Sequence, residues 1–424
     1  MNRVVITGIG VVAPCGIGKE AFWSGVESGR SYIRHDAGMA SLGFESTVLS
    51  RLDDFDIYDF GQLSEFPGLA AMDRYVQFGV IAGVQAFQDA GLMEANPSAD
   101  ESGVLFSSAI GGTATVNQIM AGLSAGGMRT FEYHPVGPEL YEAGMFNVPA
   151  ILLAEKYGLG GPAFSLSTGC TAGIDTVGLC FELIQTGDAR IMLAGASEAP
   201  LVPHAFATLD VIKALAKADP EAPEKSSRPF DAKRNGFVLG EGAAVLVLEE
   251  ESHAQARGVP IYGEVLSFSS VNNAYHMTDL HAHALDYSTV INRVLLQAGV
   301  STAEVDYINA HGSSTPQNDL FETNSFKRVF GERAYSIPIS ATKSMIGHSL
   351  SAASTMGIIA ALGAFTRSVI HPTANYTFPD PDCDLDYVPN VARRQAVNTA
   401  LVTASGFGGI HSAAIFRKYG GGAS

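Results

Sequence analysis

Short apolar stretches alternate along the chain with longer ones in which apolar residues recur every three or four positions. The short stretches predict buried strands at residues 4–7, 103–107, 189–195, 242–249, 306–310 and 400–405. The longer ones predict helices, one of which begins near residue 172, with apolar residues at Ile174, Val177, Phe181 and Ile184. Strands that alternate with helices in this way indicate an α/β fold.

A faint internal repeat indicates two halves. A glycine-containing turn at residues 235–237 leads into the strand at 242–249, and a similar turn at 405–407 leads into apolar residues 412–415. Each turn and strand would close one half, and a strand near residue 261 would open the second. We therefore expect two similar halves, residues 1–255 and 256–424.

The first strand is followed by Gly8 and Gly10, which with Ala13 match the loose dinucleotide-binding pattern G-x-G-x-x-A. However, Pro14 and further glycines follow instead of an uninterrupted helix, and no strand with an acidic end comes about 20 positions later. A turn within a packed sheet is the better interpretation.

No apolar stretch reaches the roughly 18 residues that a membrane-spanning helix needs. The longest one, residues 356–365, is interrupted by Gly357 and Gly363 and suits a core helix. We therefore expect a protein with no membrane span.

Composition and charge narrow the class of protein. The chain has 424 residues, of which 46% are hydrophobic and 16% charged, as is typical of globular proteins. A formal net charge of -17 argues against nucleic acid as a partner. Four cysteines without C-x-x-C spacing are too sparse for a disulfide framework, which fits a reducing cytoplasm. They are Cys15, Cys170, Cys180 and Cys383.

Cys170 lies among small residues directly before the helix that begins near residue 172. Unpaired N–H groups and the helix dipole favour negative charge there, so the thiolate would be stabilised and the cysteine would be a nucleophile near neutral pH. The alternative is a buried apolar cysteine, which is common among small apolar residues.

Two histidines and two charged residues in the second half could assist such a nucleophile. His311 ends a predicted strand before a polar glycine turn, where α/β proteins place ligand-binding groups, and His348 lies among small polar residues. Lys343, if buried beside them, would lower the pKa of both histidines. Glu322 lies on the helix after His311 and could pair with Lys343. Each could also be an ordinary structural or solvated residue.

Four motifs, in this order, are similar to those of the β-ketoacyl-acyl-carrier-protein synthases of the thiolase fold. They are residues 168–171, 309–312, 343–349 and 406–409. The similarity runs from Val4 to about Phe416, nearly the whole chain. It implies an α/β, thiolase-like fold of two similar halves, each with a mixed sheet, packed as a layered αβαβα core.

Residues 167–171, 317–319 and 383–389 resemble the catalytic, or alpha, ketosynthase subunit of type II aromatic polyketide synthases more than the fatty-acid enzyme. Chain-length-factor subunits look similar but carry glutamine in place of the cysteine, so Cys170 indicates the working subunit. Ala172 departs from the alpha subunits, which often have serine there.

The resemblance implies a decarboxylative Claisen condensation of malonyl-acyl-carrier protein with a cysteine-bound acyl chain. No metal or bound cofactor would take part, because the substrates arrive on the carrier protein's phosphopantetheine. The N–H groups of Cys170 and Phe407 would form an oxyanion hole, with Phe407 also acting as a gate. The implied catalytic set is Cys170, His311, His348, Lys343 and Glu322.

Ser313 and Thr315 match hydroxyls that bind pantetheine in the family, although hydroxyls are also common in turns. The implied partners are an acyl carrier protein and, in a heterodimer, a chain-length-factor homologue. Because carrier proteins are acidic, docking on this acidic chain would need a local basic patch. The residues expected there are Arg74, Lys213 and Lys217.

Three alternatives remain open. One is a fatty-acid β-ketoacyl-acyl-carrier-protein synthase II that works as a homodimer. Another is a non-catalytic subunit that shapes chain length, against which Cys170 speaks. The third is a cysteine hydrolase, in which the second histidine and the lysine would have no role.

Overall fold

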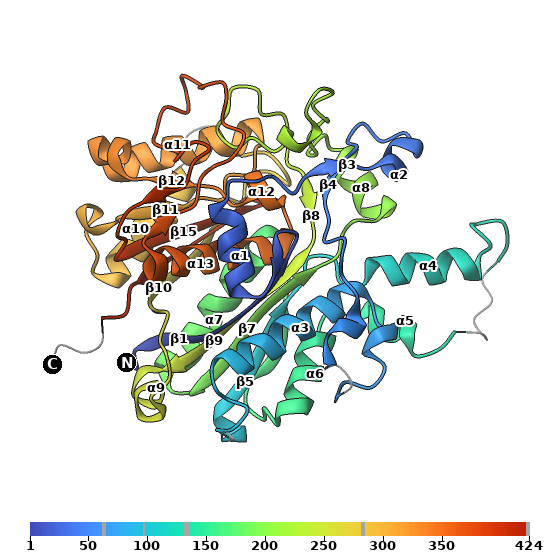
Figure 1. The fold of residues 1–424 in the computed structure, drawn as a ribbon, viewed down its shortest axis with the longest axis horizontal. Helices are drawn as coiled ribbons and strands as arrows, with labels where there is room; N and C mark the ends of the chain where they lie inside the picture. The colour runs from blue at the N-terminus through green and yellow to red at the C-terminus, as the bar shows by residue number, and fades with distance from the viewer. Residues whose placement is uncertain (62–64, 96–97, 131–135, 281–284, 421–424) are drawn as a thin grey trace.

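The computed structural model describes residues 1–61, 65–95, 98–130, 136–280 and 285–420. Two sets of strands form its centre (Figure 1). The first set runs in the order β1 (Val4–Ala13), β9 (Gly242–Glu250), β7 (Ile191–Glu198), β5 (Ser102–Ser107) and β6 (Ala163–Leu166). The second runs in the order β10 (Gly263–Asn272), β16 (Ile410–Arg417), β15 (Thr399–Gly406), β11 (Tyr307–Asn309) and β12 (Ile339–Ser340).

The two sets repeat one topology. In each, the first two strand pairings are antiparallel and the last two are parallel, so both sets are mixed sheets, as expected. Strands β1 and β10 pair antiparallel over a short register that begins at Val4 and Val265, and this pairing joins the two sets.

Helices form three layers around the sheets (Figure 1). Helices α7 (Ala172–Thr186) and α13 (Leu350–Arg367) pack against each other between the two sets, because both contact β7 while α7 also contacts β10 and α13 contacts β15. Helix α3 (Arg74–Asp89), beside α6 (Val148–Tyr157), covers the outer face of the first set. Helix α10 (Leu285–Ala298), beside α11 (Pro316–Phe330), covers that of the second. The expected αβαβα layering is confirmed.

Helix α13 explains the longest apolar stretch of the sequence. By length and composition it could cross a membrane, but 89% of its apolar window is buried within the protein. It is therefore the core helix that the glycine-interrupted pattern predicted. All four cysteine thiols are free, as their spacing indicated.

The turn predicted after residue 7 is wrong. Strand β1 continues to Ala13 with Gly8 and Gly10 inside it, where α3 packs directly on the bare backbone. A Cβ atom on Gly8 would lie 2.2 Å from the carbonyl oxygen of Ala86, and one on Gly10 would lie 1.8 Å from that of Ala82. These glycines permit the close approach of helix and strand, and no dinucleotide-binding turn forms.

The remaining elements are short and lie around this core. The helices are α1 (Lys19–Glu27), α2 (Ala37–Ser41), α4 (Thr113–Leu123), α5 (Glu139–Gly144), α8 (Pro203–Asp210), α9 (Glu251–Arg257) and α12 (Lys343–Ile346). The strands are β2 (Gly16–Ile17), β3 (Arg34–His35), β4 (Val48–Ser50), β8 (Leu239–Gly240), β13 (Val369–Ile370) and β14 (Arg393–Arg394). Helices α4 and α5 project from the body of the protein (Figure 1).

Candidate active site

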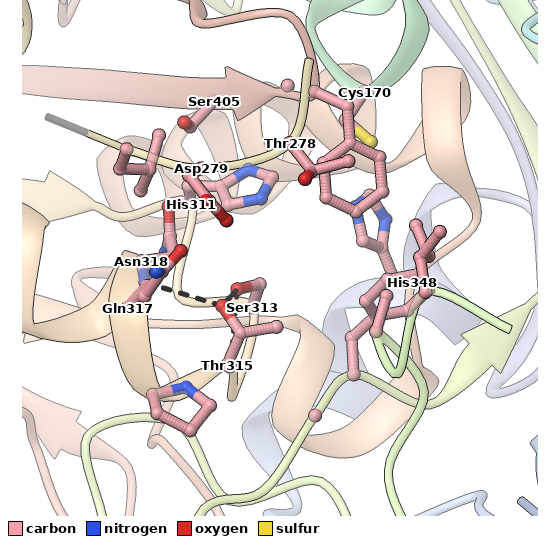
Figure 2. A pocket seen from close by; sticks show the side chains of 18 of the residues that line it. Cys170, Thr278, Asp279, His311, Ser313, Thr315, Gln317, Asn318, His348 and Ser405 are labelled. Atoms are coloured by element: carbon pink, nitrogen blue, oxygen red, sulfur yellow. Dashed lines mark hydrogen bonds between the residues drawn. The ribbon is translucent and has the colours of Figure 1, made fainter. Parts of the chain in front are cut away.

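A cavity of about 300 Å³ brings together residues from both halves of the chain. Cys170 comes from the first half, whereas His311, His348 and Phe407 come from the second (Figure 2). Three residues predicted from separate motifs thus face one space with the predicted nucleophile. Lys343 and Glu322 lie behind this lining rather than in it.

Cys170 occupies the position that the sequence predicts. It lies in the single turn of 3₁₀ helix Gly169–Thr171, which leads directly into α7 at Ala172. However, burial raises the pKa of the Cys170 thiol to about 12, although nearby Lys343 lowers it. The direction of this shift opposes the thiolate expected near neutral pH, because the loss of water outweighs the lysine and the helix terminus.

The two histidines are buried neighbours. The ring centroids of His311 and His348 lie 5.3 Å apart, with the planes nearly perpendicular. Burial lowers the pKa of both rings well below its usual value, and the charge of Lys343 lowers both further. Both imidazoles are therefore neutral at pH 7, and each can donate or accept one proton.

The ring nitrogens of these histidines have different surroundings. In both rings Nδ1 is buried without a hydrogen-bond partner among the described residues. An unpaired Nδ1 costs least as a lone pair, which places the proton on Nε2. Each ring can then offer an Nε2–H to a group in the cavity.

Glu322 fixes the backbone at His311. Its carboxylate accepts hydrogen bonds from the backbone N–H groups of His311, at 2.8 Å, and Gly312, at 2.6 Å. It also accepts from the hydroxyls of Tyr287 and Thr403 and from the amide of Asn318. Glu322 is fully buried, so it positions His311 from behind and does not reach the cavity.

Lys343 supports the same turn from another side. Its Nζ donates a hydrogen bond of 2.7 Å to the carbonyl oxygen of His311. Burial lowers the pKa of Lys343 to about 8, against the opposing charge of Glu322. The expected ion pair between Lys343 and Glu322 does not form; instead, each holds a different backbone group of one turn.

Ser313 and Thr315 line the cavity and also build the turn that follows His311. Their hydroxyl oxygens lie 2.9 Å apart, and the Thr315 hydroxyl caps α11 by accepting from the N–H of Asn318. A role in the turn and a role in binding pantetheine are thus compatible for these hydroxyls. A hydroxyl that caps a helix keeps a second lone pair.

Phe407 lies in the tight turn between β15 and β16, and its side chain is 42% exposed. Gly408 and Gly409 after it have φ angles of 85° and 71°, which favour glycine. A Cβ atom on Gly406 would lie 3.6 Å from the backbone nitrogen of Cys170, so this turn packs against the turn that holds Cys170.

In the described part of the chain, the N–H groups of Cys170 and Phe407 donate no hydrogen bond to another residue. They come from the two turns that pack together at Gly406. Both donors are therefore free to bind an oxyanion in the cavity.

Asp175 supports the candidate site from behind, and the sequence analysis missed it. Its buried carboxylate accepts hydrogen bonds from the hydroxyls of Thr168 and Thr171, which flank Cys170, and from Ser412 on β16. It therefore holds the turn of Cys170 from both sides and ties this turn to the strand after Phe407. An acidic residue among apolar neighbours in the first turn of α7 was the available signal.

The structure separates the three basic residues expected at a docking surface. Lys213 is exposed and lines the cavity. Lys217 pairs with exposed Glu45 at 2.8 Å and does not line it. The Arg74 guanidinium is held by Glu241 at 2.9 Å and packs over Phe55 and Phe78, so it is part of the fold.

Comparisons with known proteins agree with this geometry. Residues 1–254 match the family described as "Beta-ketoacyl synthase, N-terminal domain", and residues 262–377 match "Beta-ketoacyl synthase, C-terminal domain". The tetracenomycin polyketide synthase ketoacyl synthase alpha subunit of Streptomyces glaucescens is 43% identical over 98% of this chain and 97% of its own length.

Two solved structures are similar over 99% of this chain and their full length. One is a type II polyketide synthase acyl-carrier protein in complex with its ketosynthase, which is 39% identical with a TM-score of 0.92. The other is the ishigamide ketosynthase/chain length factor, which is 31% identical with a TM-score of 0.88.

Proposed function

The chain belongs to the β-ketoacyl synthase family, and on that premise we propose how its residues carry out the condensation that extends a polyketide in a type II system. The enzyme is an acyltransferase that joins a malonyl unit to a cysteine-bound acyl chain. The observation that carries the assignment of roles is one cavity that holds a thiol, two neutral imidazoles and two unpaired N–H groups.

In the first step, Cys170 takes the acyl chain from the phosphopantetheine thioester. The sulfur attacks the carbonyl carbon, the C–S bond of the thioester breaks, and the thiol proton passes to the departing thiolate. The N–H groups of Cys170 and Phe407 stabilise the oxyanion, at about 3 kcal/mol for each donor. Ser313 and Thr315 bind the amides of the pantetheine arm.

In the second step, malonyl-acyl-carrier protein enters and loses carbon dioxide. The electron pair of the broken C–C bond becomes an enolate, whose oxygen accepts hydrogen bonds from Nε2 of His311 and His348. The enolate carbon then attacks the acyl carbonyl carbon on Cys170, the new C–C bond forms as the C–S bond breaks, and the Cys170 thiolate leaves. Glu322 and Lys343 position His311 throughout.

The partners follow from the relatives. We infer an acyl carrier protein that docks at the mouth of the cavity, beside Lys213, and a chain-length-factor homologue with which the chain forms a heterodimer. We also infer a cytoplasmic location, and a division into residues 1–255, with the nucleophile, and 256–424, with both histidines.

Acylation of Cys170 tests the assignment. The protein is incubated with acyl-carrier protein, with and without the chain-length-factor partner, and its intact mass is measured. An acyl adduct should appear, vanish in Cys170→Ala and persist in Cys383→Ala, which removes a buried thiol outside the cavity. Absence of an adduct in the native chain under both conditions would remove the catalytic role.

Charge reversal tests the docking surface. Lys213→Glu should raise KM for the carrier protein and weaken the dependence of this KM on salt, because it places negative charge at the mouth. Lys217→Glu is the matched control, since Lys217 lies outside the cavity lining. Equal effects of both variants would contradict docking beside Lys213.

A further inference from the structure

A second arrangement of nucleophile, base and acid lies in the wall of the same cavity. Ser405, the last residue but one of β15, lines the cavity (Figure 2). Its Oγ lies 2.9 Å from Nδ1 of His411, its cross-strand neighbour on β16. Nε2 of the same ring lies 3.1 Å from a carboxylate oxygen of Asp286, at the start of α10.

The carboxylate sets the direction of these hydrogen bonds. Burial would raise the pKa of Asp286, but the hydrogen bond with His411 prevails and lowers it below its ordinary value. An ionised carboxylate draws the imidazole proton to Nε2, which leaves a lone pair on Nδ1. The Ser405 hydroxyl then donates to Nδ1 and presents its oxygen lone pairs elsewhere.

Packing holds the imidazole in this orientation. The His411 side chain is fully buried, with ring centroids of Tyr287 and Phe321 at 5.1 and 5.3 Å. The base therefore cannot turn away from Ser405. A base held by a third group and bonded to a hydroxyl is the arrangement that activates serine nucleophiles, on whatever fold it occurs.

The condensation does not use these three residues, because Cys170, His311 and His348 account for each of its steps. We propose that Ser405, His411 and Asp286 form a second acyl-transfer site, which hydrolyses acyl thioesters bound in the cavity. Its substrate class is an acyl thioester, either free or attached to Cys170.

The reaction balances without a further reagent. Ser405 Oγ forms a bond to the thioester carbonyl carbon while its proton passes to Nδ1 of His411, and the C–S bond breaks as the leaving thiolate takes that proton. Water then attacks the Ser405 ester, with His411 accepting the water proton and returning it to the serine oxygen. The products are a free thiol and a carboxylic acid.

The oxyanion of both steps has a donor nearby. Phe407 is two residues after Ser405, and its backbone N–H has no other acceptor among the described residues. The two sites would therefore share this donor, so a chain bound for condensation could also be released by hydrolysis.

A serine-directed fluorophosphonate tests the nucleophile. The probe is applied to the Cys170→Ala protein, and the labelled residue is found by peptide mass mapping. We expect label on Ser405 and none on Ser313, a hydroxyl of the same cavity without a histidine partner. His411→Gln, which keeps hydrogen-bonding reach but removes the base, should slow labelling by about 100-fold or more.

Hydrolysis gives the second readout. In Cys170→Ala, release of thiol from an acyl-N-acetylcysteamine thioester should fall to background when Ser405→Ala is added. A second measurement uses the protein with Cys170 intact. If the chain attached to Cys170 is also a substrate, the Ser405→Ala substitution should lengthen the lifetime of the acyl-Cys170 adduct. An unchanged lifetime limits the substrate to free thioesters.

The outcomes that overturn the proposal are definite. No label on Ser405, or labelling that is equally fast in His411→Gln, would show that the three residues only fill the hairpin. If His411→Gln does not fold, Asp286→Asn replaces it, with a fall in labelling of at least tenfold expected. Neither failure affects the acylation of Cys170, which is measured separately.

Discussion

Replacing Glu322 with glutamine should weaken both the fold and the catalytic turn. Oε1 accepts from the N–H of His311 and from two hydroxyls, and Oε2 accepts from the N–H of Gly312 and from the Asn318 amide. The NH₂ group of a glutamine cannot accept a hydrogen bond. It does least damage in the place of Oε2, where it faces two donors instead of three. Each lost hydrogen bond to a charged group costs about 1.5–3 kcal/mol, which gives about 3–6 kcal/mol for Glu322→Gln.

Calorimetry and turnover measure this effect. For a chain of 424 residues, an unfolding entropy of about 0.9 kcal/mol/K converts 1 kcal/mol into about 1 °C, so Tm should fall by about 3–6 °C. Turnover should fall as well, because the N–H groups that hold His311 in place lose their acceptor. Glu155→Gln, at an exposed position of α6, is the matched control. A Glu322→Gln protein with unchanged Tm and turnover would refute the positioning role.

Three other substitutions probe the site and the fold. Lys343→Met should slow alkylation of Cys170 about tenfold below pH 8, and the difference should shrink above pH 8, where the native lysine loses its charge; a constant ratio would contradict this. Asp175→Asn loses at least one of its three hydroxyl donors, so the rate of acylation, followed by intact mass, should fall about tenfold. Gly10→Ala forces a Cβ into the α3 backbone and should cost about 1–3 kcal/mol in unfolding free energy, whereas Gly122→Ala, in open space, should cost nothing.

The parts of the site that the sequence predicts correctly are local ones. The small residues around Cys170 and the apolar spacing after it determine a turn followed by a helix. The polar glycine turn after a buried strand likewise determines the surroundings of His311. The order of the four motifs, and not a local pattern, predicted that these segments meet in one cavity. No local pattern gives the distance between residues that are 141 positions apart, as Cys170 and His311 are.

The predictions that failed depend on packing between distant segments. Glu322 accepts hydrogen bonds from the hydroxyls of Tyr287 and Thr403, which lie 35 and 81 residues away in the chain. These hydrogen bonds take the place of the ion pair with Lys343 that the sequence predicted. Gly8 and Gly10 resembled a turn because the helix that requires them lies over 70 residues later in the chain. Asp175 was missed for the same reason, since Ser412 is 237 residues away.

One physical cause explains the protonation states of the whole site. Burial disfavours charge, so it keeps the proton on Cys170 and keeps His311 and His348 neutral. Because burial raises the pKa of the Cys170 thiol, the thiol keeps its proton at pH 7 and its attack must be coupled to proton transfer. That proton passes to the thiolate that leaves the phosphopantetheine, so the two neutral imidazoles keep their Nε2–H groups for the enolate. When a thioester occupies the cavity, the oxyanion donors stabilise the charge that the attack of the Cys170 sulfur creates.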